Sequence, residues 1–206
     1  MGIFNRLPVV SGGLITLLDA GNSSSYIGTG NIWRDVSGNN NHATIFNSPT
    51  YSTQNGGYFV MNGTNNYITP STSVLATNTT QMLWYKWNGV NQAAGLSILG
   101  NGSSTGYGMY MNNGTNSPTV GNRISGLIAA NSYNGGGSTS GLSSINWSHI
   151  TMIRNTVINS MQLYVNGILD GSGNTFAFGA DTVLSCLLYT SPSPRDYAAS
   201  RMPSSA

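Results

Sequence analysis

Short stretches of alternating apolar and polar residues run along most of the chain, separated by clusters of Gly, Asn and Ser. A period of two is typical of β-strands with one face in a core, because successive side chains point to opposite faces. No segment combines a period of 3.6 with matching caps, so no helix is predicted. The predicted strands are Leu14–Asp19, Tyr58–Asn62, Thr80–Trp87, Leu96–Leu99, Tyr107–Met111, Arg123–Ala129, Trp147–Arg154 and Met161–Val165.

One turn between predicted strands has a strong sequence signal. Asn166-Gly167 follows Met161–Val165 and precedes Ile168-Leu169. This dipeptide favours a two-residue hairpin, because both central positions of the preferred turn need a positive φ. Many short strands with frequent turns predict an all-β fold, a sandwich or a barrel, in one domain. The Gly-rich and Ser-rich loop over residues 130–144 is long enough to be functional or mobile.

Composition supports the all-β interpretation. Charged residues make up 6% of the 206 residues, the chain has no Glu, and Asn, Ser, Thr and 27 Gly take the place of charge. Helices disfavour these residues and turns accept them. The net charge of +2 comes from scattered basic residues, so no electrostatic footprint for nucleic acid is present. No apolar run approaches the length of a membrane span, and residues 1–13 lack the core of a signal peptide.

The last residues differ from the rest of the chain. Cys186, the sole cysteine, opens a Pro-rich and Ser-rich segment in which the alternation stops. One choice of codons for residues 186–196 resembles the end of a transposase-type sequencing adapter. Residues 200–206 resemble, in the same frame, the primer site that follows a barcode. We therefore expect residues 186–206 to be a non-native tail, which would leave the natural domain truncated near Ser185 and without cysteine.

Seven segments follow one another in a distinctive order: Leu14–Asn22, Trp33–Ala43, Gly57–Gly63, Asn66–Ile68, Trp84–Lys86, Trp147–His149 and Leu163–Gly167. In order and spacing they resemble laminin-G-like, concanavalin-A-like jelly-roll domains over roughly residues 12–180. The opening, with Asp-Ala-Gly-Asn and a Ser/Tyr/Gly loop before Trp33, resembles the version found in tailed-phage virion proteins.

The resemblance implies an antiparallel jelly-roll β-sandwich that binds carbohydrate or protein on its concave face or loop rim. It divides the chain into a leader over residues 1–12, an incomplete domain over residues 13–185 and the tail. The family's final strand pairs beside the first, so truncation predicts an unpaired edge. The phage resemblance implies a virion or extracellular location.

Catalysis is not expected. Relatives of this fold that cleave glycans need two carboxylates across the glycosidic bond, and the family supplies them from a compact cluster containing Glu. The chain without its tail has only Asp19, Asp35, Asp170 and Asp181, spread widely along the sequence. No nucleophile elbow appears, and His149 is expected to be an ordinary strand residue.

A calcium site is the one cofactor considered. The turn over residues 35–41 offers the Asp35 carboxylate, the Asn39 amide and backbone carbonyls, and Asp19 could join them. Alternatively, Asp35 and Asn39 cap a tight turn by side-chain to backbone hydrogen bonds. The turn interpretation is favoured, because a single carboxylate makes a weak calcium site.

Aromatic residues supply the candidate ligand site. In the strand Thr80–Trp87 both faces are apolar, Met82, Trp84 and Lys86 on one and Leu83, Tyr85 and Trp87 on the other. Only one face of a sandwich strand meets the core, so the other exposes aromatic rings. The predicted ligand-binding residues are Tyr85, Trp87, Asn66 and Tyr67. Trp33 and Trp147 are predicted to be core.

Three functional hypotheses follow. The first is a non-catalytic recognition module for a glycan or cell-surface polysaccharide, in a phage virion or tail-associated protein. The second is a structural decoration or assembly domain that contacts other virion proteins and has no glycan ligand. The third, a hydrolase related to the glucanases, would require paired carboxylates in the missing portion. Fold alone does not decide among them.

Overall fold

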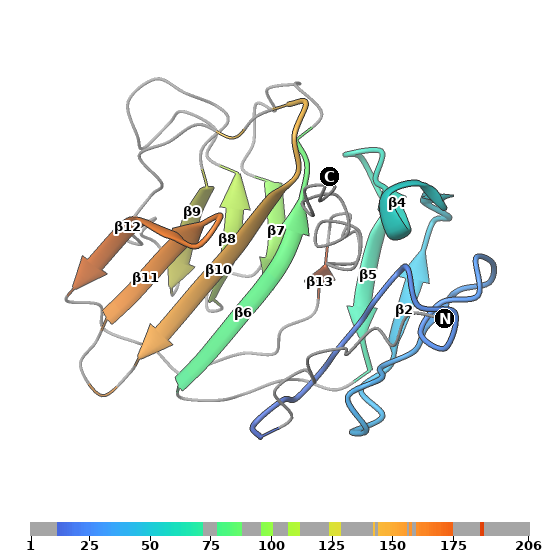
Figure 1. Cartoon of the computed structure of the whole chain (residues 1–206), viewed down its shortest axis with the longest axis horizontal. Helices are drawn as coiled ribbons and strands as arrows, with labels where there is room; N and C mark the ends of the chain where they lie inside the picture. Colours follow the sequence, from blue (N-terminus) through green and yellow to red (C-terminus); the bar gives the residue numbers. More distant parts are fainter. Residues whose placement is uncertain are drawn as a thin grey trace, which may run out of the picture.

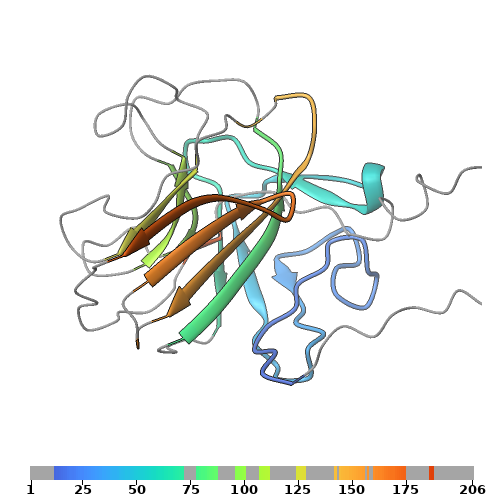
Figure 2. The same ribbon diagram turned by 60° about the vertical axis from the view of Figure 1, so that its left-hand side comes forward.

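Two antiparallel β-sheets packed face to face make up the body of the protein (Figures 1 and 2). The computed structural model describes residues 12–71, 78–87, 96–100, 107–111, 124–128, 142, 144–155, 157, 160–174 and 186–187. In these segments the sole helical turn is the 3-10 turn η1, Gln54–Gly56. No helix among them is long and apolar enough to cross a membrane.

The larger sheet has seven strands in the order β1-β2-β5-β13-β7-β8-β9. Every pairing in it is antiparallel. Its strands are β1 (Ile32–Trp33), β2 (Ala43–Phe46), β5 (Tyr67–Pro70), β7 (Leu96–Gly100), β8 (Tyr107–Met111), β9 (Ile124–Ile128) and β13 (Cys186–Leu187).

The smaller sheet has four strands in the order β12-β11-β10-β6, also antiparallel. Figure 1 shows it in front of β7, β8 and β9. Its strands are β6 (Asn78–Tyr85), β10 (Ser148–Asn155), β11 (Ser160–Val165) and β12 (Ile168–Asn174), and a separate hairpin is formed by β3 (Thr50–Ser52) and β4 (Tyr58–Val60). The predicted antiparallel β-sandwich is confirmed.

Most predicted strands are present with shifted ends, and one is wrong. The segment Leu14–Asp19 forms no ladder. The Leu17 amide donates instead to the Asp35 carboxylate (2.8 Å), and the Val36 amide donates to the Leu17 carbonyl (2.9 Å). The predicted loop over residues 130–144 lies outside the described residues, apart from Leu142 and Ser144.

The hairpin predicted at Asn166-Gly167 is confirmed. Both residues have positive φ, 52° and 80°, as a two-residue turn between twisted strands requires. The Asn166 side chain also ties the turn to β10, because its Oδ1 accepts a hydrogen bond from the His149 amide at 2.9 Å. The turn therefore fixes the register of β11 with both of its neighbours.

Residues at the start of the predicted tail lie in the larger sheet. Cys186 pairs with Gly100 of β7, and Leu187 pairs with both Leu99 and Ile68 of β5. Ladder hydrogen bonds join backbone groups, so a two-residue segment of many sequences can occupy such a position. The boundary at Ser185 stays a prediction, and residues 188–206 lie outside the described part.

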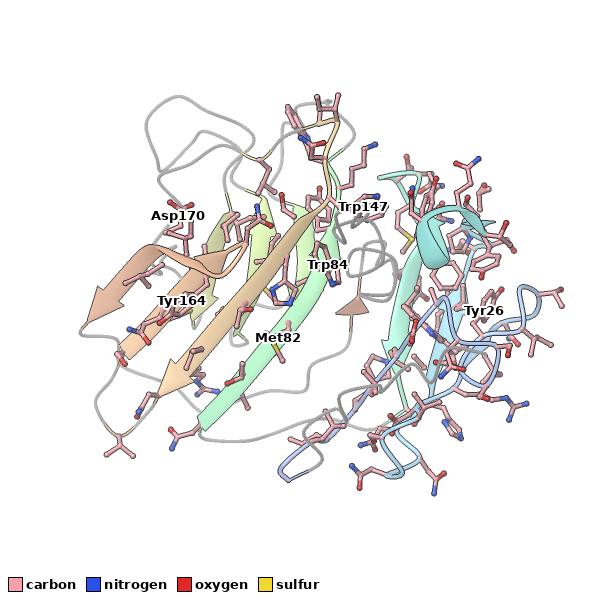
Figure 3. All side chains as sticks on the ribbon, viewed as in Figure 1. Tyr26, Met82, Trp84, Trp147, Tyr164 and Asp170 are labelled. Atoms are coloured by element: carbon pink, nitrogen blue, oxygen red, sulfur yellow. The ribbon has the colours of Figure 1, made fainter. Side chains whose placement is uncertain are left out.

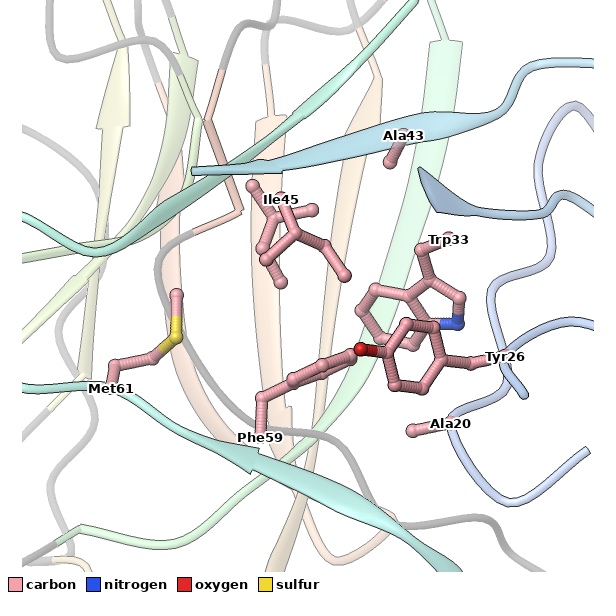
Figure 4. Close-up of a cluster of buried hydrophobic side chains, with 8 residues drawn as sticks. Ala20, Tyr26, Trp33, Ala43, Ile45, Phe59 and Met61 are labelled. Carbon is pink, nitrogen blue, oxygen red and sulfur yellow. The ribbon is translucent and has the colours of Figure 1, made fainter. Parts of the chain in front are cut away.

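An aromatic cluster fills the core between the N-terminal segment and β4 (Figure 4). Phe59 is fully buried, and its ring packs against Tyr26 and Trp33 with centroids 4.9 Å away in each case, edge to face. Tyr51 closes the cluster at 5.5 Å from Phe59. Trp33 is 2% exposed, which confirms its predicted place in the core.

Gly57, next to this cluster, cannot take a side chain. Its φ is 95°, and an added Cβ would lie 2.6 Å from the Ala20 carbonyl oxygen and 2.8 Å from the Tyr51 hydroxyl. That hydroxyl donates to the same carbonyl at 2.9 Å, so neither group can move without breaking the bond. Gly57→Ala is expected to lower the free energy of unfolding by about 2 kcal/mol, from backbone strain and displacement together.

Gly30→Ala is the matched control. Gly30 has a similar φ of 88° with nothing within 4 Å of an added Cβ, so only the backbone strain of about 1 kcal/mol applies. Urea unfolding of both variants measures the difference. Equal losses in the two variants would contradict the proposed clash.

Candidate functional site

The smaller sheet has a buried face and an outer face. On β10, Ser148, Ile150, Met152 and Arg154 are buried, whereas the residues between them are half-buried. The half-buried set therefore points away from the larger sheet. We call the exposed side of β6, β10, β11 and β12 the outer face.

A row of side chains crosses the outer face from edge to edge. Thr151 of β10 lies opposite Met82 of β6 and Tyr164 of β11, and Tyr164 lies opposite Leu169 of β12. Met82 is 61% exposed and Leu169 is 49% exposed. Figure 3 shows Met82 and Tyr164 on the same side of this sheet. The row is an apolar strip with one hydroxyl at its centre.

Aromatic rings extend the strip toward one end of β6 and β10. Trp84 lies opposite His149, with ring centroids 5.1 Å apart. Trp147, directly before β10, contacts Tyr58 of β4 edge to face at 5.2 Å. Trp147 is half-buried, so it lies at the margin of the sheet rather than in the predicted core position. Figure 3 shows Trp147, Trp84 and Met82 following one another along the strands.

The outer face carries little charge. The strands β6, β10 and β11 contain no carboxylate, and their single cation, Arg154, is 2% exposed on the buried side. Burial lowers the pKa of His149 below its usual value, so this imidazole is neutral at pH 7. The chemistry on offer is ring stacking and hydrogen bonding by neutral groups.

The predicted orientation of β6 is wrong. Tyr85, predicted to face a ligand, is 2% exposed, and Leu83 beside it is 7% exposed. The exposed set is the other one, because Met82 and Trp84 share the outer face with His149 and Thr151 through the register with β10. Trp87 lies beyond the end of β6 and is half-buried.

Asn66 and Tyr67 belong to the other sheet. Asn66 is 4% exposed; its Oδ1 accepts from the Asn62 amide at 2.8 Å, and its Nδ2 donates to the Asn47 carbonyl at 2.6 Å. These bonds occupy its amide in shaping the turn before β5. Tyr67 stacks on Phe46 of β2 with centroids 4.5 Å apart. The structure thus does not bring these two residues together with the aromatic residues of β6.

The Asp35 carboxylate is the centre of the N-terminal segment. Oδ1 accepts hydrogen bonds from the amides of Leu17 (2.8 Å) and Ser37 (2.9 Å), and Oδ2 accepts from the Ser37 hydroxyl (2.7 Å) and the Asn41 amide (2.9 Å). Burial raises the pKa of Asp35, but these hydrogen bonds outweigh it and hold the pKa below its usual value. The geometry is that of the turn-capping interpretation.

The two other candidate calcium ligands also have local bonds. The Asn39 side-chain amide donates to the Leu14 carbonyl at 2.7 Å, and Asp19 Oδ1 accepts from the Gly21 amide at 3.0 Å. No group of three His, Cys, Asp or Glu residues suited to a metal ion occurs in the described segments. Calcium binding by Asp35, Asn39 and Asp19 stays a prediction.

The described aspartates come from two distant parts of the fold. Asp170 lies on β12, the edge strand farthest from β6 in the smaller sheet. Asp35 lies between β1 and β2, and Figure 1 shows β2 and β12 on opposite sides of the molecule. Asp181, the fourth aspartate before the tail, lies outside the described residues.

Comparison with protein families identifies the fold. A model described as "Concanavalin A-like lectin/glucanases superfamily" matches residues 62–188, more than half of the chain and all four strands of the smaller sheet. The chain belongs to this superfamily. Comparison of this concanavalin A-like chain with curated proteins gives no match.

Solved structures similar to this concanavalin A-like domain include binding domains. One is the binding domain of botulinum neurotoxin DC in complex with SialylT (TM-score 0.62, 12% identity), which covers 89% of this chain and 44% of the toxin chain. Another is domain 4 of AbnA, a GH43 extracellular arabinanase from Geobacillus stearothermophilus, in complex with arabinotriose (TM-score 0.53, 14% identity, 76% of each chain). The chain spans less than half of the toxin structures it matches. At these identities the similarity shows the fold alone.

Proposed function

We propose that this protein is a non-catalytic carbohydrate-recognition module whose ligand lies on the outer face of the smaller sheet. The observation that carries the proposal is the exposed strip of Trp84, Met82 and Tyr164, interspersed with neutral hydrogen-bonding groups. A sugar ring presents an apolar C–H face and a rim of hydroxyls, so it matches rings and neutral polar groups in combination. Most soluble proteins leave few such contiguous apolar surfaces open unless they bind something.

The family and its relatives support this proposal. The superfamily includes lectins, and two structures of similar fold were obtained with glycans, SialylT and arabinotriose. We place the module in a phage virion or tail-associated protein, on the resemblance of the segment before Trp33 to that of phage proteins. In that setting the ligand is a cell-surface polysaccharide.

A structural decoration domain without a glycan ligand is the second candidate. The same exposed strip would then pack against another virion protein, since large apolar side chains such as Met82 and Leu169 suit a protein partner as well. The two candidates differ in whether a free oligosaccharide protects Trp84. That difference makes Trp84 the residue to test.

Trp84→Ala is expected to weaken binding of oligosaccharides at least tenfold, the loss of roughly 1.4 kcal/mol of stacking. Isothermal titration against a panel of oligosaccharides measures it, with the quenching of tryptophan fluorescence as a second signal. Tyr67→Ala is the control: this aromatic side chain is also half-buried but lies on the larger sheet, stacked on Phe46. Its affinity should equal that of the parent.

Circular dichroism melting of both variants separates binding from folding. If no oligosaccharide binds the folded parent protein, the recognition proposal fails and the decoration domain takes its place. If Tyr67→Ala abolishes binding and Trp84→Ala does not, the site lies on the larger sheet.

A further inference from the structure

We infer that the outer face selects an uncharged, linear oligosaccharide lying along β6 and β10, and that it rejects acidic sugars. This inference rests on the proposed function and adds the class of ligand to it. It depends on two properties of the outer face, the direction of its aromatic strip and the position of its charges.

The direction of the strip is along the strands. Trp147 precedes β10, Trp84 and His149 form the next level, and Met82 and Thr151 form the level after that (Figure 3). Side chains on one face of a strand recur roughly every 6.5–7 Å. This step is comparable to the advance of an extended glycan by one sugar. Three successive sugars of a linear chain therefore meet three successive levels.

Neutral polar groups accompany each level. His149 lies beside Trp84, Thr151 lies beside Met82, and Gln162 of β11 is half-buried on the same face, opposite Ile153. The imidazole, hydroxyl and amide can hydrogen-bond to sugar hydroxyls as donors and as acceptors. None of them carries a charge at pH 7, since burial lowers the pKa of His149.

The position of charges excludes an acidic ligand. A carboxylate that leaves water for a partly buried, uncharged surface loses hydration and needs a cation in return. On the described strands beneath the strip the one cation is Arg154, which is 2% exposed on the opposite side of the sheet. Lys86 is exposed but follows the end of β6, so it can meet only a terminal group.

The test compares neutral and acidic oligosaccharides on the full chain. Isothermal titration is run with arabinotriose, xylotriose, cellotriose and maltotriose against trigalacturonate and sialyllactose, with the methyl ester of trigalacturonate as the neutral match of the same backbone. The tightest ligand is expected to be a neutral trisaccharide that binds at least tenfold better than any acid. Its affinity should be unchanged by added salt and should fall at least tenfold for the monosaccharide.

Thr151→Lys supplies the missing cation at the centre of the strip. The variant is expected to bind trigalacturonate about tenfold more tightly than the parent, with no gain for its methyl ester. An acid that binds the parent as well as the best neutral sugar would overturn the inference and leave the recognition function in place. Failure of every neutral and acidic sugar to bind would overturn both.

Discussion

Asp35→Ala is expected to lower the free energy of unfolding by about 3–5 kcal/mol. The substitution removes the acceptor of four hydrogen bonds, three of them from the backbone amides of Leu17, Ser37 and Asn41. Hydrogen bonds to a charged group contribute roughly 1.5–3 kcal/mol each, and a buried donor left without a partner costs more than the bond itself. Urea unfolding followed by tryptophan fluorescence measures the loss.

Two controls define the origin of this effect. Asp35→Asn keeps one oxygen, so it should lose only part of the stability. The pH dependence gives the second control: because the folded pKa of Asp35 is below its usual value, its contribution is present above about pH 4 and is lost as the pH falls through the folded pKa. The acid-induced loss of stability should be smaller in Asp35→Asn than in the parent. Identical acid profiles would contradict the assigned role.

Phe59→Ala is expected to cost about 3–5 kcal/mol, as for large aromatic side chains removed from a packed core. The ring is fully buried and is the one member of the aromatic cluster that contacts Tyr26, Trp33 and Tyr51. Edge-to-face pairs add roughly 0.5–1.5 kcal/mol each beyond area burial. The alanine variant leaves a cavity beside Trp33, so the emission of this indole should shift as well.

Phe46→Ala is the matched control for the cluster. Phe46 is 37% exposed and stacks on Tyr67 at the surface, so its removal should cost less than about 1.5 kcal/mol. Chemical denaturation of the two variants under the same conditions gives the comparison. Losses within 1 kcal/mol of each other would show that the cluster does not hold the N-terminal segment to β4.

The strands of the smaller sheet could be predicted because their alternation is regular. The N-terminal segment could not, although Leu14–Asp19 is as apolar as a strand. Its backbone bonds go to the Asp35 side chain and to Val36, and a pattern of apolar positions carries no information about which acceptor an amide finds. The turn role of Asp35 was accessible from sequence, because Asp and Asn two residues before an amide form such turns.

The ligand face of β6 was assigned wrongly for a different reason. Both alternating sets of this strand are apolar, so period two identifies a strand but does not say which set is buried. The neighbouring strand holds the missing information. Across the register, Trp84 meets His149 and Met82 meets Thr151, whereas Tyr85 meets Ser148 and Leu83 meets Ile150. The more polar partners lie on the outer face, a signal that exists only once the two strands are paired.

The place of β13 affects how the chain folds during synthesis. This strand joins β5 to β7, so the two outer parts of the larger sheet, β1-β2-β5 and β7-β8-β9, meet only through Cys186–Leu187. The pairing of Leu187 with Ile68 closes a loop that contains the whole smaller sheet. Contacts so distant in sequence form slowly. On the ribosome, β5 and β7 therefore expose open edges until this last strand emerges, and that interval is when the nascent chain is most exposed to association with its neighbours.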